Sequence, residues 1–235
     1  MKKHLSVLML FVRSTLYRFL LLVLAMAAVQ AVLFALAFRG GMGVFGLYTI
    51  IEETRPGIVF AVCFLLLCAM LCLTGCEFGS KSGYTLSRLR ISRQMEFLWR
   101  CVGNAGFIFL FWAAQAGITL TFCGIFMIHY PQGQATMLVF YANDFLHNLL
   151  PLAETGILAR NIALLIALAV TTACFPIRMR RGKMPAAAIA VALICVVFFV
   201  RDKGSFTGNA MLSIVTLSIA AYAAYAVCRK EAAYE

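Results

Sequence analysis

Long apolar runs alternate with short polar segments along this chain. Six of the runs approach the roughly twenty residues that a helix needs to cross a membrane. They predict spans over residues 19–38, 58–76, 101–128, 157–177, 184–200 and 205–227. The third run is long enough to tilt or to extend beyond the membrane, and the fourth is expected to end at Pro176, because proline disrupts a helix. The pattern therefore predicts an all-α integral membrane protein, with a six-helix transmembrane bundle over residues 19–235.

Two further segments mix polar and apolar side chains. Residues 1–18 combine four basic side chains with leucines and a phenylalanine, which predicts an amphipathic N-terminal helix lying at the membrane interface. A cleaved signal peptide is the alternative, although Arg13 and Arg18 interrupt its apolar part. Residues 129–156 contain an apolar stripe at helical spacing opposite Asn143, Asp144, His147 and Asn148. This loop is expected to form an outer interfacial helix.

A basic interruption separates the second and third apolar runs. Residues 77–100 carry Lys81 and four arginines against only two glutamates, with leucines and an isoleucine between the charges. Short loops rich in lysine and arginine stay in the cytoplasm. We therefore expect this loop to be cytoplasmic, where it either lies along the membrane or docks onto a soluble partner.

The basic residues also orient the whole chain. Fifteen of the twenty lysines and arginines fall on the side of the 77–100 loop, together with both termini. This bias predicts cytoplasmic termini and an even number of spans. The formal charge of +11 does not indicate nucleic-acid binding, because the excess lies in short loops where it sets topology. We expect a multi-pass protein of the cell membrane, in contact with the lipid bilayer.

Composition offers little support for catalysis. The mean hydropathy is +0.94, and the nine cysteines are expected to pack as small apolar side chains rather than to bind metal. The segment GCEFGSKS at 75–82 lacks the glycine directly before the lysine that a phosphate-binding loop requires. No acidic or basic side chain is expected in the middle of a span, which argues against a carrier driven by protons or sodium. We expect no cofactor, no metal and no enzymatic activity.

The topology and one segment together suggest a family. The segment TLSRLRISRQMEFLWR at 85–100 is similar to the coupling segment of the permease subunits of type 2, exporter-class ATP-binding-cassette (ABC) transporters. The chain particularly resembles the compact permeases of Gram-positive gut bacteria. Those relatives often carry a proline before the isoleucine, where this chain has Arg90. The run DFLHNLLPL at 144–152 also resembles the outer amphipathic helix of small family members.

This resemblance implies partners and a docking site. A separate cytoplasmic ABC ATPase subunit would hydrolyse ATP, and a second permease copy or a paralogue would complete the dimer. The expected ATPase-docking residues are Leu86, Arg88, Leu89, Arg90, Ile91 and Arg93. Export of a substrate is the implied function. A non-transporting accessory or bacteriocin-immunity protein remains the alternative, because it would show the same topology, and a membrane-embedded enzyme is a more distant one.

Overall fold

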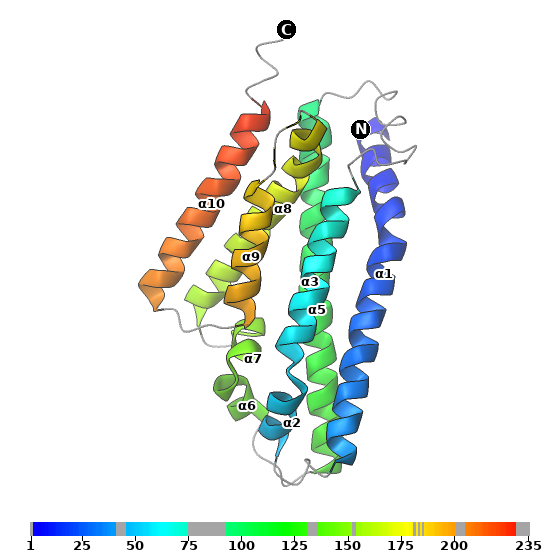
Figure 1. Ribbon diagram of the computed structural model, residues 1–235, viewed down its shortest axis with the longest axis vertical. Helices are drawn as coiled ribbons and strands as arrows, with labels where there is room; N and C mark the ends of the chain where they lie inside the picture. The colour runs from blue at the N-terminus through cyan, green and yellow to red at the C-terminus, as the bar shows by residue number, and fades with distance from the viewer. Residues whose placement is uncertain are drawn as a thin grey trace.

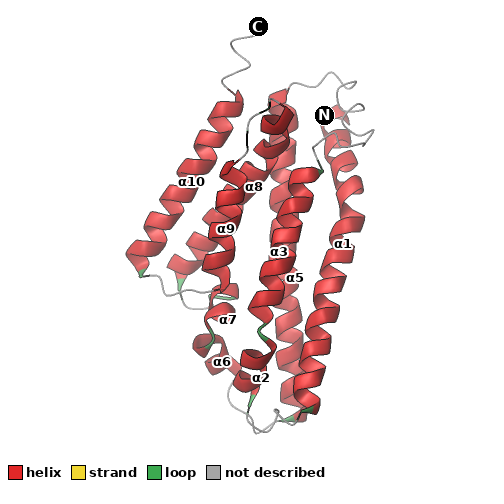
Figure 2. Ribbon diagram, viewed as in Figure 1, coloured by secondary structure: helices red, strands yellow, loops and turns green. Residues whose placement is uncertain are grey.

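The structure is a computed structural model that describes residues 2–40, 46–74, 93–130, 136–151, 154–180, 182, 184, 186–200 and 205–228. All regular secondary structure within these ranges is helical (Figure 2). The apolar runs form helices because a helix satisfies every backbone polar group within one segment, which a lipid environment requires. The expected all-α fold class is therefore confirmed for the described part of the chain.

Five of the described helices are long and apolar enough to cross a membrane. These are α1 (Lys2–Arg39), α3 (Pro56–Leu73), α5 (Arg93–His129), α8 (Thr155–Arg180) and α10 (Phe206–Cys228). A sixth apolar helix, α9 (Ala186–Val200), has only 15 residues, or roughly 22 Å of length. The five long helices mark the chain as a multi-pass membrane protein.

Consecutive apolar helices run in alternating directions (Figure 1). The start of α1, the end of α3, the start of α5 and the end of α10 lie at one end of the bundle, which we call the terminal end. Three short helices, α2 (Leu47–Thr54), α6 (Thr136–Ala142) and α7 (Asp144–Leu149), lie at the opposite end, which we call the far end. The two ends therefore differ in architecture as well as in the segments they present.

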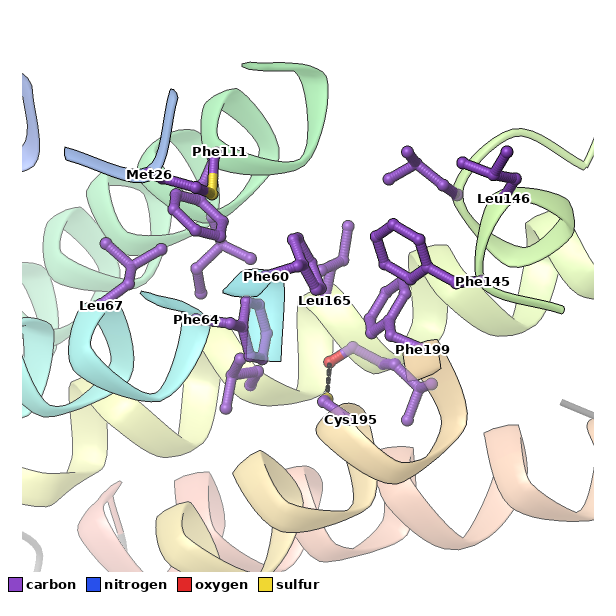
Figure 3. Packing of buried hydrophobic residues seen from close by; sticks show 14 of the residues in the cluster. Met26, Phe60, Phe64, Leu67, Phe111, Phe145, Leu146, Leu165, Cys195 and Phe199 are labelled. Carbon is purple, nitrogen blue, oxygen red and sulfur yellow. Dashed lines mark hydrogen bonds between the residues drawn. The ribbon is translucent and has the colours of Figure 1, made fainter. Parts of the chain in front are cut away.

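Helix α8 is the most enclosed of the long helices, with 61% of its apolar window buried, against 39% or less for the other four. It packs against α5, α9 and α10. The neighbouring core is rich in phenylalanine, and Figure 3 shows Phe60, Phe64, Phe145 and Phe199 close together. Their ring centroids lie 5.5 to 6.0 Å apart. These stacked, tilted and edge-on aromatic contacts connect α3, α7 and α9.

The helices differ from the expected spans at several places. The separate helix expected over residues 1–18 is continuous with the first span in α1, and whether its first part lies along a membrane surface stays a prediction. Helix α5 begins at Arg93, so residues 93–100 of the expected loop are helical. The expected end at Pro176 was wrong, since α8 continues to Arg180. A proline removes one N–H bond, and packing against neighbouring helices compensates for that loss.

The outer amphipathic segment also differs in detail. Instead of one helix, the structure has α6 and α7 joined at Asn143. The Asn143 side chain accepts a hydrogen bond from the backbone N–H of Leu146 at 3.2 Å, so it caps the start of α7. Asparagine competes for backbone hydrogen bonds and favours such a cap over a helix interior. The apolar stripe is partly confirmed, because Phe145 and Leu146 are buried whereas Tyr141 is 54% exposed.

Candidate functional site

The expected docking residues lie at the edge of what the structure describes. Leu86, Arg88, Leu89, Arg90 and Ile91 fall outside the described residues, and Arg93 is the first residue of α5. The nearest described structure is therefore the first turns of α5, which follow the predicted docking segment directly.

Charged side chains near the start of α5 form a partly buried pair. The Arg100 guanidinium lies 2.8 Å from a Glu96 carboxylate oxygen, one turn earlier on the helix, and the two side chains are only 8% and 20% exposed. Sequence analysis had assigned Arg100 to the cytoplasmic loop over residues 77–100. The helix instead presents the pair at four-residue spacing, which stabilises the first turns of α5.

The same turns of α5 contact two other helices. Phe97 packs against a small core formed by Cys174 of α8 with Ala223 and Val227 of α10. Two turns further along, the Asn104 side-chain amide donates a hydrogen bond to the Thr172 hydroxyl of α8 at 3.0 Å. The start of α5 is thus attached to α8 and α10 by an apolar contact and a buried hydrogen bond.

A second polar contact joins α1 to the middle of α5. Gln30 and Gln115 exchange amide hydrogen bonds of 2.9 and 3.1 Å. Both side chains are buried, with exposures of 4% and 0%. The Thr119 hydroxyl lies 3.4 Å from the Gln115 amide nitrogen, which donates to it. Buried amides that satisfy one another in this way fix the register between two helices without placing a charge in the bundle.

A buried polar cluster lies at the far end and surrounds Arg160, which is fully buried. Its Nη1 donates to the Asn209 side-chain oxygen on α10 at 2.9 Å, and its Nη2 donates to the Asn148 side-chain oxygen on α7 at 3.1 Å. The same guanidinium also bonds the adjacent Asn161 oxygen at 3.1 to 3.3 Å. Its Cζ lies 5.8 Å from the centroid of the Phe198 ring on α9, within reach of a cation–π contact.

Sequence analysis did not predict this cluster. Arg160 was one of the five basic residues that the charge count left on the outer side of the membrane. Asn148 had been assigned to the polar face of an interfacial helix. The structure turns Asn148 inward and buries it completely, and its backbone oxygen also accepts a 2.7 Å bond from the Asn161 amide. The available signal was an Arg-Asn pair one turn inside an apolar run. An ionisable residue in such a position is usually paired and buried.

The described residues contain no group of three or more histidine, cysteine or acidic side chains placed to hold a metal ion. No protein-family model, curated protein or solved structure matches the chain. The functional argument therefore depends on the fold and on the contacts given above.

Proposed function

We propose that the chain is the membrane-spanning permease subunit of a type 2 ABC transporter, with six spans and both termini in the cytoplasm. ATP hydrolysis takes place in a separate cytoplasmic ATPase subunit, which docks on Leu86, Leu89 and Ile91. Export of a substrate requires a second copy of this chain or a paralogue. The amphipathic sequence of the 77–100 segment and its likeness to a coupling segment support this proposal.

One structural observation supports it further. Helix α5 follows the proposed docking segment and continues for 37 residues to the far end, a length of roughly 55 Å. Phe97 and Asn104, near its start, contact α8 and α10, whereas Gln115 contacts α1. A displacement of the docking segment would therefore move α5 together with the helices packed against it. Rigid helices that connect two ends of a molecule are a physical route for such coupling.

Substitutions in the docking segment test the proposal. Leu89→Asp and Ile91→Asp should each abolish co-purification of an ATPase from native membranes, because burying a carboxylate in an apolar cleft is costly. Arg88→Gln should weaken co-purification by less than about tenfold, since a rim charge contributes about 1 kcal/mol or less. The measurement is the amount of ATPase per purified chain after mild detergent extraction.

Ser87→Asp is the matched control, because it introduces the same charge at a polar position of the same segment. It should retain the ATPase at close to the wild-type level. If both apolar-to-aspartate variants also retain it, the segment does not dock an ATPase. If the wild-type chain retains none, the permease proposal is rejected, and the accessory or immunity protein becomes the better interpretation.

A further inference from the structure

An open cleft of about 520 Å³ lies at the far end of the molecule. It is bordered by α2, the start of α3, the junction of α6 with α7, and the last residue of α9. Figure 1 shows α2, α6 and α7 at the end opposite the start of α1. The volume falls within the range of about 300–1,000 Å³ that is usual for small-molecule sites.

The inner wall of the cleft is apolar and closely packed. Ile51, Ile58, Phe145 and Val200 contribute to it. Gly57 lets α3 approach α7, because a Cβ atom at this position would lie 3.2 Å from the Phe145 ring. The wall is therefore formed by direct contact between two helices.

The rim of the cleft carries charges of both signs. Glu52, Arg55 and Asp144 line it, and all three side chains are exposed. None of them takes part in the ion pairs that the structure gives for the described residues, Glu96 with Arg100 and His147 with Glu154. Two carboxylates and one guanidinium thus border a single cleft without forming an ion pair with one another.

The backbone holds Arg55 in an unusual conformation at this rim. Its φ of 42° and ψ of 55° are left-handed, and it is the only non-glycine residue with positive φ in the described part of the chain. Its N–H bonds the Ile51 carbonyl at 3.1 Å, and its carbonyl accepts from the Ile58 N–H at 3.0 Å. The next residue, Pro56, disfavours the right-handed helical conformation at Arg55. Strained positions of this kind cost about 1–3 kcal/mol and are frequent at ligand sites.

The position of the cleft along the helices suggests what occupies it. The apolar helices α3 and α9 begin and end here, at Pro56 and Val200. Two apolar helices therefore have their ends at the cleft, which would place it near the lipid head groups of a membrane that these helices cross. Ile58 is 52% exposed and extends the apolar wall toward the lipid-facing surface of α3.

We propose that this cleft binds the head group of a zwitterionic aminophospholipid, of the phosphatidylethanolamine class. The phosphate would bond the Arg55 guanidinium, and the primary ammonium would bond the Glu52 and Asp144 carboxylates. The first acyl carbons would lie over Ile58 and Val200. A guanidinium matches a phosphate in charge and geometry, and an ammonium supplies three N–H donors to the carboxylates.

The charges also discriminate between lipid classes. An anionic lipid would gain the contact with Arg55 but would face Glu52 and Asp144, which repel it. A choline lipid carries no N–H donor for these two carboxylates. The cleft should therefore prefer phosphatidylethanolamine over phosphatidylglycerol and phosphatidylcholine. This inference is independent of ATPase docking, so either proposal can fail without the other.

Native mass spectrometry of the full-length chain tests the preference. The chain is released from micelles that contain the three lipids with identical acyl chains at equal concentration. We expect bound phosphatidylethanolamine to exceed either other lipid by about tenfold, in line with hydrogen bonds to charged groups. Arg55→Gln should lower this binding by about tenfold, and Glu52→Gln with Asp144→Asn should remove the preference over phosphatidylcholine.

Two neighbouring residues provide matched controls. Arg39→Gln removes another exposed far-end arginine, and Glu53→Gln removes the carboxylate next to Glu52; neither residue lines the cleft. Both should leave the lipid preference unchanged, and thermal melts should show that all variants remain folded. The proposal is overturned if the three lipids bind equally, if phosphatidylglycerol binds best, or if Arg55→Gln behaves like Arg39→Gln.

Discussion

At the scale of single residues, Arg160 shows how a charge is accommodated inside an apolar bundle. A guanidinium has five N–H donors and is not deprotonated in proteins. The structure supplies side-chain amide oxygens from Asn148, Asn161 and Asn209, together with the face of the Phe198 ring. These groups come from α7, α8, α10 and α9, so one side chain connects four helices at the far end.

Truncating one of these partners should destabilise the fold. Asn209→Ala removes the oxygen that accepts from Arg160 Nη1 at 2.9 Å. We expect the free energy of unfolding in mixed micelles to fall by about 1–2 kcal/mol, between typical values for bonds to charged groups and for bonds within membrane bundles. The control is Ser218→Ala, at an exposed position of the same helix. Equal stability of the two variants would contradict the assigned role of Arg160.

At the scale of elements, the apolar runs predicted the helices well because their length and composition leave no other structure for them in lipid. Each expected span overlaps a helix of the structure. The misses arose where side-chain contacts decide the outcome. The cap at Asn143 divides the outer segment. Helix α2, in which Ile50 and Ile51 are buried, was not predicted from the sequence.

The buried polar contacts were harder to predict than the helices. Gln30 and Gln115 were visible as isolated polar residues inside apolar runs, but nothing in the sequence indicated that they meet across 85 positions. The same holds for Arg160 and Asn209, which are 49 positions apart. Periodicity identifies elements, whereas pairing between elements depends on how the helices pack.

The Gln30–Gln115 contact can be measured with a double-mutant cycle. Gln30→Leu and Gln115→Leu should each lower the stability by about 1 kcal/mol, because each leaves a buried amide without its partner. The double variant should be closer to wild type than the sum of the two effects predicts, since two leucines leave no unsatisfied amide. Unfolding in mixed micelles gives all four values. Strict additivity would show that the two amides do not interact.

At the scale of the whole molecule, the two ends of the bundle carry different charges. The described arginines toward the terminal end include Arg93 and Arg100 at the start of α5 and Arg178 and Arg180 at the end of α8. The far end has Arg39 and Arg55, and it buries Arg160. Within the described part of the chain, these four arginines lie on the side that the sequence analysis assigned to the cytoplasm.

This asymmetry predicts the orientation of the protein. The positive-inside bias places the terminal end in the cytoplasm and the far end, with its lipid-binding cleft, on the outer side. Truncation fusions to a phosphatase active only outside and to a fluorescent protein active only inside should report it. We expect phosphatase activity after Glu53 and after Asp144, and fluorescence after Arg93, Lys183 and Glu235.

A variant with three neutralised arginines makes this topology test specific. Replacing Arg88, Arg90 and Arg93 by glutamine removes three of the fifteen basic residues expected inside, so it should lower the fluorescence of the fusion after Arg93 relative to the wild-type sequence. The matched control replaces Arg39 and Arg55, on the other side of the membrane, by glutamine. It should strengthen the positive-inside bias and leave the fluorescence of the fusion after Arg93 unchanged. Phosphatase activity after Arg93 in the wild-type sequence would invert the topology. It would then place the proposed docking segment out of reach of any cytoplasmic ATPase, and the permease proposal would fail with it.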